Sequence, residues 1–122
     1  MCEYTIYHNP RCSKSRETLK LLHDNGIEPE VVEYLDEPPT RTELRQIVRA
    51  LGIPARELIR RKDKRFVELG DPDVRYSDSA AVNLLAEHPQ LIERPIVVRE
   101  NRAVIGRPPE NILALLTDDE PV

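Results

Sequence analysis

The first third of the chain alternates between strand-like and helix-like sequence, and this alternation restricts the possible folds more than any other feature. Residues 3–7 and 30–35 are rich in β-branched and aromatic side chains, which favour strands. Between them, from residue 12 or 13 to residue 25, Thr18 and Leu22 recur on one face at helical spacing. A strand, a helix and a second strand in this order predict two parallel strands joined by a crossover helix.

The middle of the chain favours helices. Thr40 and Glu43 form the reciprocal capping pair that opens a helix, and apolar residues follow at helical spacing. Predicted helices begin at Thr40, run from Ala55 to about Lys62, and cover residues 78–87. The second of these helices contains Arg60, whereas the charged, turn-rich residues 63–76 favour no regular element.

The last third predicts a β-hairpin followed by a helix. Residues 95–99 and 102–106 read as strands, and the Glu-Asn pair between them suits a tight antiparallel turn. A final helix, opened by two prolines, is predicted over residues 108–116, before a frayed tail over residues 117–122.

Together these elements predict a single α/β domain over residues 1–122. About four strands form a mixed sheet with helices on its faces, and a helical insertion over about residues 40–88 separates the second strand from the third. The length of 122 residues suits one domain and is enough to bury a hydrophobic core.

Composition argues against several classes of protein. The net charge of −4 argues against a general nucleic-acid-binding surface, which is usually basic. No apolar run approaches the ~20 residues of a membrane-spanning helix, and the N-terminus lacks the pattern of a signal peptide. With only two cysteines the chain is not a disulfide scaffold, so we expect it in the reducing cytoplasm.

Cys12 is the first candidate for chemistry. It follows a strand and a proline turn and stands at the start of a helix, where free N–H groups and the helix dipole lower the pKa of a thiol. Arg11, Lys14 and Arg16 are close in sequence and add positive charge. The alternative is a structural cysteine buried at a helix start, but no apolar side chain flanks Cys12 within two positions.

Cys12 has no resolving thiol in its own loop, because Ser15 stands three residues further on. Cys2 lies at the far end of the first strand, roughly 17 Å away at ~3.3 Å per residue, whereas a disulfide needs Cα atoms within about 7 Å. Redox chemistry at Cys12 therefore requires a thiol from another molecule.

His8 lies at the end of the first strand, before the same loop. It either hydrogen-bonds across the loop and stabilises the turn, or helps to lower the pKa of the thiol. No set of His, Cys, Asp and Glu residues has the spacing of a zinc site, so we expect no metal.

Three arginines are candidates for binding an anion, although the usual place of an arginine is a solvated surface. Arg94 precedes one strand of the hairpin and Arg107 follows the other, so pairing of the strands brings both to the same end. Arg60 cannot be placed from spacing alone. Cis bonds before proline are uncommon in folded proteins. Pro95, however, begins a strand opposite a cysteine at the start of a helix, and in one class of fold this arrangement favours a cis Arg94–Pro95 bond.

Several separated motifs resemble those of the glutaredoxin-coupled arsenate reductases, which have a thioredoxin-like fold. The loop Tyr-His-Asn-Pro-Arg-Cys-Ser-Lys-Ser-Arg over residues 7–16 is the most distinctive. The others, in the same order along the chain, are residues 33–35, 38–39, 58–60, 88–89, 94–98 and 106–108. The resemblance covers residues 3 to 116.

The resemblance implies that Cys12 is the nucleophile that attacks arsenate. It implies substrate-binding roles for Arg60, Arg94 and Arg107, and a supporting role in the loop for His8, thought to favour the thiolate, and Ser15. Glutathione is the implied co-substrate and glutaredoxin the implied partner, with no bound cofactor.

The loop departs from the better-characterised members of the family, which carry Gly and Thr where this chain has Ser13 and Lys14. The chain thus resembles a subgroup with Cys-Ser-Lys-Ser in the loop. One alternative function is a monothiol oxidoreductase that acts on glutathione mixed disulfides, which the Cys-x-x-Ser pattern suits. A less favoured alternative is a thioredoxin-like regulator that binds RNA polymerase, because its Cys-x-x-Cys switch is incomplete here.

Overall fold

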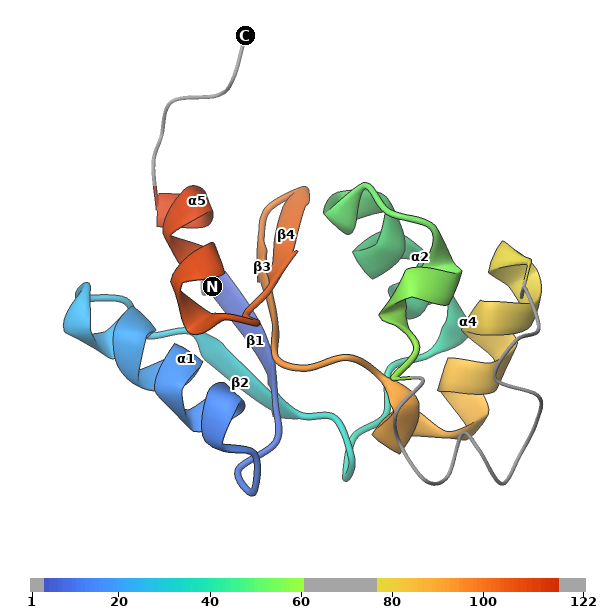
Figure 1. The fold of residues 1–122 in the computed structure, drawn as a ribbon, viewed down its shortest axis with the longest axis horizontal. Helices are drawn as coiled ribbons and strands as arrows, with labels where there is room; N and C mark the ends of the chain where they lie inside the picture. Colours follow the sequence, from blue (N-terminus) through green and yellow to red (C-terminus); the bar gives the residue numbers. More distant parts are fainter. Residues whose placement is uncertain (1–3, 61–76, 117–122) are drawn as a thin grey trace, which may run out of the picture.

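The computed structural model describes residues 4–60 and 77–116 (Figure 1). The strands are β1 (Tyr4–His8), β2 (Glu30–Glu33), β3 (Ile96–Arg99) and β4 (Arg102–Ile105). The α-helices are α1 (Ser13–Asp24), α2 (Arg41–Leu51), α4 (Asp78–Glu87) and α5 (Leu113–Leu116). The 3₁₀ turns within the described residues are η1 (Ala55–Leu58), η2 (Pro89–Leu91) and η3 (Pro109–Ile112).

The four strands form one mixed sheet in the order β2-β1-β3-β4. β1 and β2 are parallel, with His8 opposite Glu33 at their carboxyl ends. β3 runs antiparallel to both β1 and β4, so the predicted hairpin and the predicted parallel crossover are both confirmed.

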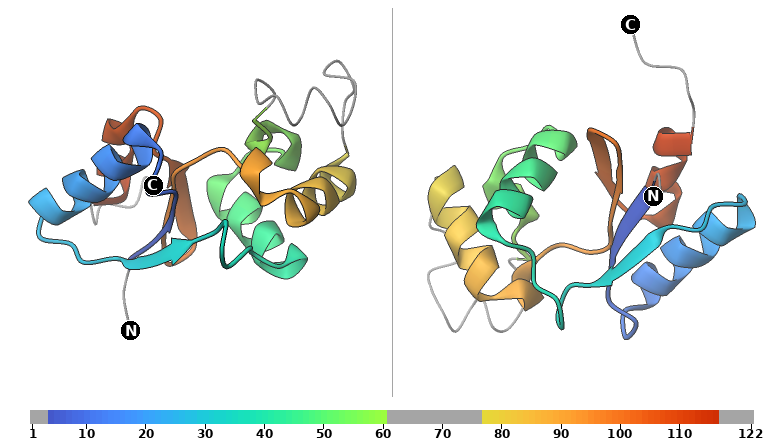
Figure 2. Two further views of the ribbon diagram at one scale, coloured as in Figure 1. Left: turned by 90° about the horizontal axis from the view of Figure 1, so that it is seen from below. Right: turned by 180° about the vertical axis from the view of Figure 1, so that it is seen from behind.

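Each face of the sheet is covered by its own group of helices (Figure 2). Side chains alternate along the strands, so Ile6 and Val97 pack with α1, η3 and α5, whereas Tyr7 and Ile96 face the cluster formed with α2 and α4. Successive side chains of a strand point to opposite faces of the sheet, so a strand covered on both sides contributes to two separate hydrophobic clusters. Among the described residues, the helices α2 and α4 lie between β2 and β3, where the helical insertion was predicted.

Local sequence signals explain where the helices begin and end. Thr40 accepts from the Glu43 N–H while the Glu43 side chain accepts from the Thr40 N–H, which is the predicted capping pair. Gly52 closes α2 with a left-handed φ of 70°, a conformation that costs glycine little. Ser77 caps α4 through the N–H of Ala80.

The helix predicted from Ala55 to about Lys62 is wrong, because the 3₁₀ turn η1 ends at Leu58 and the chain then becomes extended. Ile59 forms an isolated antiparallel bridge with Ile92. The Arg60 N–H donates to Leu91 O at 2.7 Å, so these backbone groups bond across the chain rather than within a helix.

Two further predictions need comment. The second strand is shorter than the predicted residues 30–35 and stops at Glu33, because the N–H groups of Asp36 and Glu37 both donate to Glu33 O and turn the chain. The predictions for residues 63–76 and for the tail at 117–122 lie outside the described residues. Within the described ranges, no helix is both long and apolar enough to cross a bilayer.

Candidate active site

The loop between β1 and α1 is a turn closed by its own backbone. The Cys12 N–H donates to Asn9 O at 3.0 Å, and the Arg11 N–H donates to Asn9 Oδ1 at 3.0 Å. Asparagine followed by proline favours such a turn, because proline presets the backbone angle at the second position. The turn delivers Cys12 to the N-cap of α1, as the sequence predicts.

Ser15 holds this loop from the first turn of α1. Its side chain is fully buried, and its Oγ lies 2.6 Å from His8 Nδ1 and accepts from the Asn9 N–H at 3.0 Å. The sequence left two possibilities for His8, and the hydrogen bond across the loop is the contact that the structure contains.

Burial raises the pKa of the partly exposed Cys12 thiol, but opposing contacts outweigh that effect and leave it below its ordinary value. The backbone N–H groups of Ser15 and Lys14 and the Arg94 guanidinium, through a hydrogen bond and its charge, lower the pKa. Two of these donors come from the free end of α1, as expected for a thiol at a helix N-terminus.

The pKa of His8 is also lowered, first by burial and further by the charge of Arg16, although Glu33 acts in the opposite direction. A lowered pKa keeps the imidazole neutral at neutral pH. A neutral ring does not stabilise a thiolate by its charge, so this geometry favours the loop-supporting role for His8.

Arg60 and Arg94 stand on two short segments that pair with each other, and Arg94 reaches Cys12. The bridge between Ile59 and Ile92 is flanked by two backbone hydrogen bonds, Arg60 N–H to Leu91 O and Glu93 N–H to Leu58 O. Arg94 Nη1 donates to Gln90 O at 3.4 Å, so the guanidinium turns back toward the Arg60 end of the bridge.

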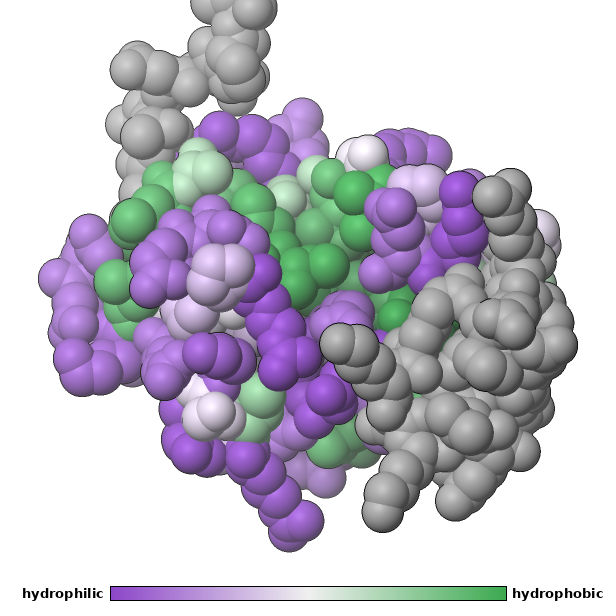
Figure 3. Space-filling view, in the orientation of Figure 1, coloured by the Kyte–Doolittle hydropathy of each residue, from purple (hydrophilic) through white to green (hydrophobic). Residues whose placement is uncertain are grey.

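Arg107 lies at the same end of the hairpin as Arg94, as predicted, because the Gly106 N–H donates to Pro95 O at 2.8 Å. The bonds before Pro95 and Pro108 are both cis; the second was not expected. The exposed Arg107 side chain lies 3.8 Å from the Glu93 carboxylate. Both residues line a hollow beside apolar side chains of β4. Figure 3 shows apolar surface gathered near the middle of the molecule, where Figure 1 places β4.

Gly106 allows the hairpin to approach α1. An added Cβ would lie 2.7 Å from Thr18 Oγ1 and 2.9 Å from Pro95 Cγ, which is closer than side chains normally pack. The buried Thr18 hydroxyl also donates to Lys14 O at 2.8 Å. The close approach of Gly106 to Thr18 sets the distance between α1, which begins after Cys12, and the strand ends that bear Arg94 and Arg107.

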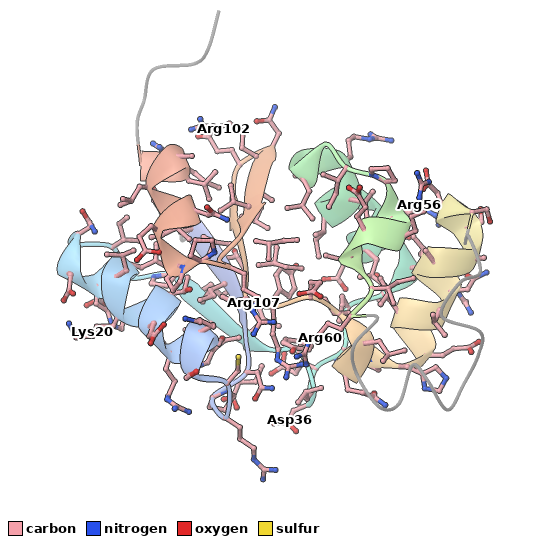
Figure 4. All side chains as sticks on the ribbon, in the orientation of Figure 1. Lys20, Asp36, Arg56, Arg60, Arg102 and Arg107 are labelled. Atoms are coloured by element: carbon pink, nitrogen blue, oxygen red, sulfur yellow. The ribbon has the colours of Figure 1, made fainter. Side chains whose placement is uncertain are left out.

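Figure 4 shows Arg60 and Arg107 near the centre of the molecule, between the sheet and the helical insertion. Lys20, Arg56 and Arg102 lie at its periphery. The cation of Lys14, by contrast, pairs with Glu17 at 3.6 Å along the exposed side of α1. Of the described residues, no three His, Cys, Asp or Glu side chains are placed to hold a metal ion.

Tyr34 is the residue of this region to which the sequence assigned no role. It follows β2 directly and is 0 % exposed, yet its hydroxyl has no hydrogen-bond partner among the described residues. The same holds for Arg94 Nε. A tyrosine next to a strand end is an ordinary core residue by sequence, and only tertiary structure shows that its hydroxyl lacks a partner.

Comparison with known proteins gives consistent matches. A model described as "ArsC family" matches residues 7–115. A protein of Escherichia coli strain K12, described as "Uncharacterized protein YfgD", is 51% identical over 112 residues, which are 91% of this chain and 94% of that one. An arsenate reductase of Neisseria meningitidis serogroup B is 49% identical over 117 residues, 95% of this chain and 100% of its own. A solved structure described as arsenate reductase from Vibrio cholerae superposes with a TM-score of 0.87 at 47% identity and covers 93% of this chain and 97% of its own.

Proposed function

The chain belongs to the ArsC family, and from this membership we propose that it reduces arsenate to arsenite at Cys12. The family resemblance and the thioredoxin-like fold predicted from the sequence are both confirmed. The observation that best supports the reaction is a thiol of lowered pKa at a helix N-terminus, with the Arg94 guanidinium beside it. The thiolate supplies a nucleophile, and the cation attracts an oxyanion.

The first step forms a bond between Cys12 Sγ and arsenic(V) while one arsenic–oxygen bond breaks. The departing oxygen is protonated and leaves as water. Arg94 neutralises charge on the remaining oxygens, and fixed cations of this kind stabilise a developing anion most when they are already in place.

Reduction then requires two electrons from thiols, and we propose glutathione and a glutaredoxin as their source. Glutathione displaces a second oxygen as water and forms a second sulfur–arsenic bond. A glutaredoxin thiolate then attacks the glutathione sulfur and forms a mixed disulfide with it. The electron pair of the broken sulfur–arsenic bond passes to arsenic, which becomes arsenic(III). Hydrolysis of the Cys12–arsenic bond releases arsenite and restores the thiol.

An external thiol suits this loop because Ser15 occupies the position of a resolving cysteine and its Oγ already bonds to His8 and Asn9. Ser15 thus supports the loop rather than supplying electrons. Free glutathione is abundant in reducing compartments, so the proposal places the reaction in the cytoplasm.

We assign Arg60 and Arg107 to the same anion site as Arg94. Arg60 is held at the paired segment beside it. Arg107 is exposed, and its contact with Glu93 at 3.8 Å is long. A solvent-exposed ion pair contributes about 1 kcal/mol or less, so an entering oxyanion can compete for this guanidinium.

Arsenate-dependent NADPH oxidation, coupled through glutathione, glutaredoxin and glutathione reductase, tests the reaction. We expect turnover by the wild-type protein, loss of turnover in Cys12→Ser, and full activity in the matched control Cys2→Ser. Turnover by the Cys12→Ser variant would refute the assignment of the nucleophile.

The Cys-x-x-Ser loop also suits exchange with glutathione mixed disulfides, which is the second candidate function. A variant with Arg60, Arg94 and Arg107 all replaced by Gln separates the two. Arsenate reduction requires the cations, whereas exchange at Cys12 needs only the thiolate. Because Arg94 also lowers the pKa of Cys12, exchange is compared at a pH at which the thiol is ionised in both proteins. Unchanged exchange there, together with no arsenate turnover by the wild-type protein, would favour the second candidate.

A further inference from the structure

Two polar atoms near Cys12 are buried without hydrogen-bond partners among the described residues. They are the hydroxyl oxygen of Tyr34, in a side chain that is 0 % exposed, and Nε of Arg94. Nearly all buried polar groups in native proteins are paired, because an unpaired donor loses its hydrogen bonds to water without replacement. Two such donors in one region indicate a place where a ligand completes the hydrogen bonding.

The fold explains why the Tyr34 ring lies at this place. Its neighbour Glu33 pairs with His8, so Tyr34 stands at the end of the sheet where the chain turns toward Cys12. The ring packs in the cluster that contains Ile59 and Ile92, the two residues whose bridge holds Arg60 and Arg94. Tyr34 therefore lies at the end of the sheet from which the loop to Cys12 begins, and it packs with the segments that bear Arg60 and Arg94.

We propose that the Tyr34 hydroxyl donates a hydrogen bond to the oxyanion bound between Cys12 and Arg94, and so contributes directly to substrate binding. The inference rests on the proposed function for the identity of the anion. It adds an uncharged donor to a site otherwise composed of cations and backbone N–H groups.

The protonation state of the hydroxyl suits a donor. Burial raises the pKa of Tyr34, and a thiolate at Cys12 raises it further. The charges of Arg94 and Arg60, and donation from the Arg94 guanidinium toward the phenol oxygen when it is ionised, only partly offset these effects. A guanidinium only donates, so the O–H of Tyr34 stays available to a ligand. The phenol therefore keeps its proton at neutral pH, including when the nucleophile is ionised. It neither repels an incoming anion nor accepts a proton from it.

Tyr34→Phe removes the hydroxyl and keeps the ring, so it separates binding from packing. A hydrogen bond to a charged ligand corresponds to roughly a 10- to 100-fold change in affinity. We expect the concentration of arsenate that half-protects Cys12 from iodoacetamide to rise by about this factor. Because the hydroxyl has no partner without the ligand, the urea midpoint of unfolding should equal or exceed that of the wild-type protein.

Tyr7→Phe is the matched control. Tyr7 packs against the same hydrophobic cluster, but it lines a different hollow, beside Glu43 and Asn101. Its loss of a hydroxyl should leave arsenate protection unchanged. A purely structural role for Tyr34 predicts the reverse of the expected pattern: a lower urea midpoint in Tyr34→Phe, with unchanged protection by arsenate.

The outcomes also separate this inference from the proposed function. Equal arsenate protection in the wild type and in Tyr34→Phe overturns the inference and leaves arsenate reduction intact. Weaker protection in Tyr34→Phe, in a protein that shows no arsenate turnover, supports the inference and refutes the proposed reaction. If neither arsenate nor phosphate protects Cys12 in the wild-type protein, the inference is overturned as well.

Discussion

Replacement of Gly106 by alanine tests whether the close approach of α1 to the hairpin holds the site together. The new Cβ would lie 2.7 Å from Thr18 Oγ1, 3.0 Å from Thr18 Cγ2 and 2.9 Å from Pro95 Cγ. Contacts this short force small displacements in a packed core, which typically cost about 1–3 kcal/mol. For a domain of this length, each kcal/mol lowers the melting temperature by about 4 °C.

A second substitution makes this prediction specific. Thr18→Ala removes both threonine atoms in the contact, but it also removes the hydrogen bond to Lys14 O, at about 1 kcal/mol. We therefore expect Gly106→Ala and Thr18→Ala to be less destabilising together than the sum of their separate effects. The rescue is partial, because Pro95 Cγ remains 2.9 Å from the new methyl group.

Urea unfolding of the four proteins in this cycle measures the coupling. Gly26→Ala is the matched control, because its Cβ would meet nothing within 4 Å and its cost arises only from a φ of 76°. Thr18→Ala should not rescue that control. The reasoning fails if Gly106→Ala is as stable as the wild type, or if its effect and that of Thr18→Ala are additive.

Three further predictions follow from the charges around the thiol. Arg94→Gln should raise the pKa of Cys12, so labelling by iodoacetamide will require a higher pH. A labelling profile identical to that of the wild type would contradict this. Lys14→Ala is the control, and it should shift the profile less, because the Lys14 side chain pairs with Glu17. Since folding lowers the pKa of His8, stability should be complete above about pH 6.5 and decline as the pH falls below it. His8→Gln should reduce that decline in pH-dependent urea unfolding, and an unaltered decline would exclude His8 as its source. Glu93→Gln should release Arg107 from its ion pair and so lower the KM for arsenate. The decrease should be at most about fivefold, because such a pair contributes about 1 kcal/mol. A higher KM would contradict this.

Local signals explain the parts of the fold that the sequence predicted well. The capping pair of Thr40 and Glu43 and the two-residue turn of the hairpin depend on neighbouring residues, and both occur as expected. Pairing of the two hairpin strands brings the residue before the first strand close to the residue after the second. Arg94 and Arg107 could therefore be placed at one end of the hairpin from the sequence alone.

Long-range contacts explain the parts that the sequence did not predict. Arg60 was expected in a helix, because nothing near it in the chain indicates that Ile59 pairs with Ile92. Tyr34 was part of a recognised motif but had no assigned role, since the isolation of its hydroxyl depends on elements far apart in sequence. Both Arg60 and Tyr34 thus required knowledge of contacts between distant segments, whereas the end of β2 at Glu33 was misplaced because of a local turn.

The unusual Ser13-Lys14 pair in the loop bears less on thiol chemistry than the sequence alone suggests. The groups of the loop that lower the pKa of Cys12 are the backbone N–H groups of Lys14 and Ser15, which any residue other than proline supplies. Both side chains of the pair are exposed, and Lys14 pairs with Glu17 along the helix. The backbone donors therefore remain in place when Gly and Thr are replaced by Ser and Lys. The identity of residues 13 and 14 should accordingly affect the ionisation of Cys12 little.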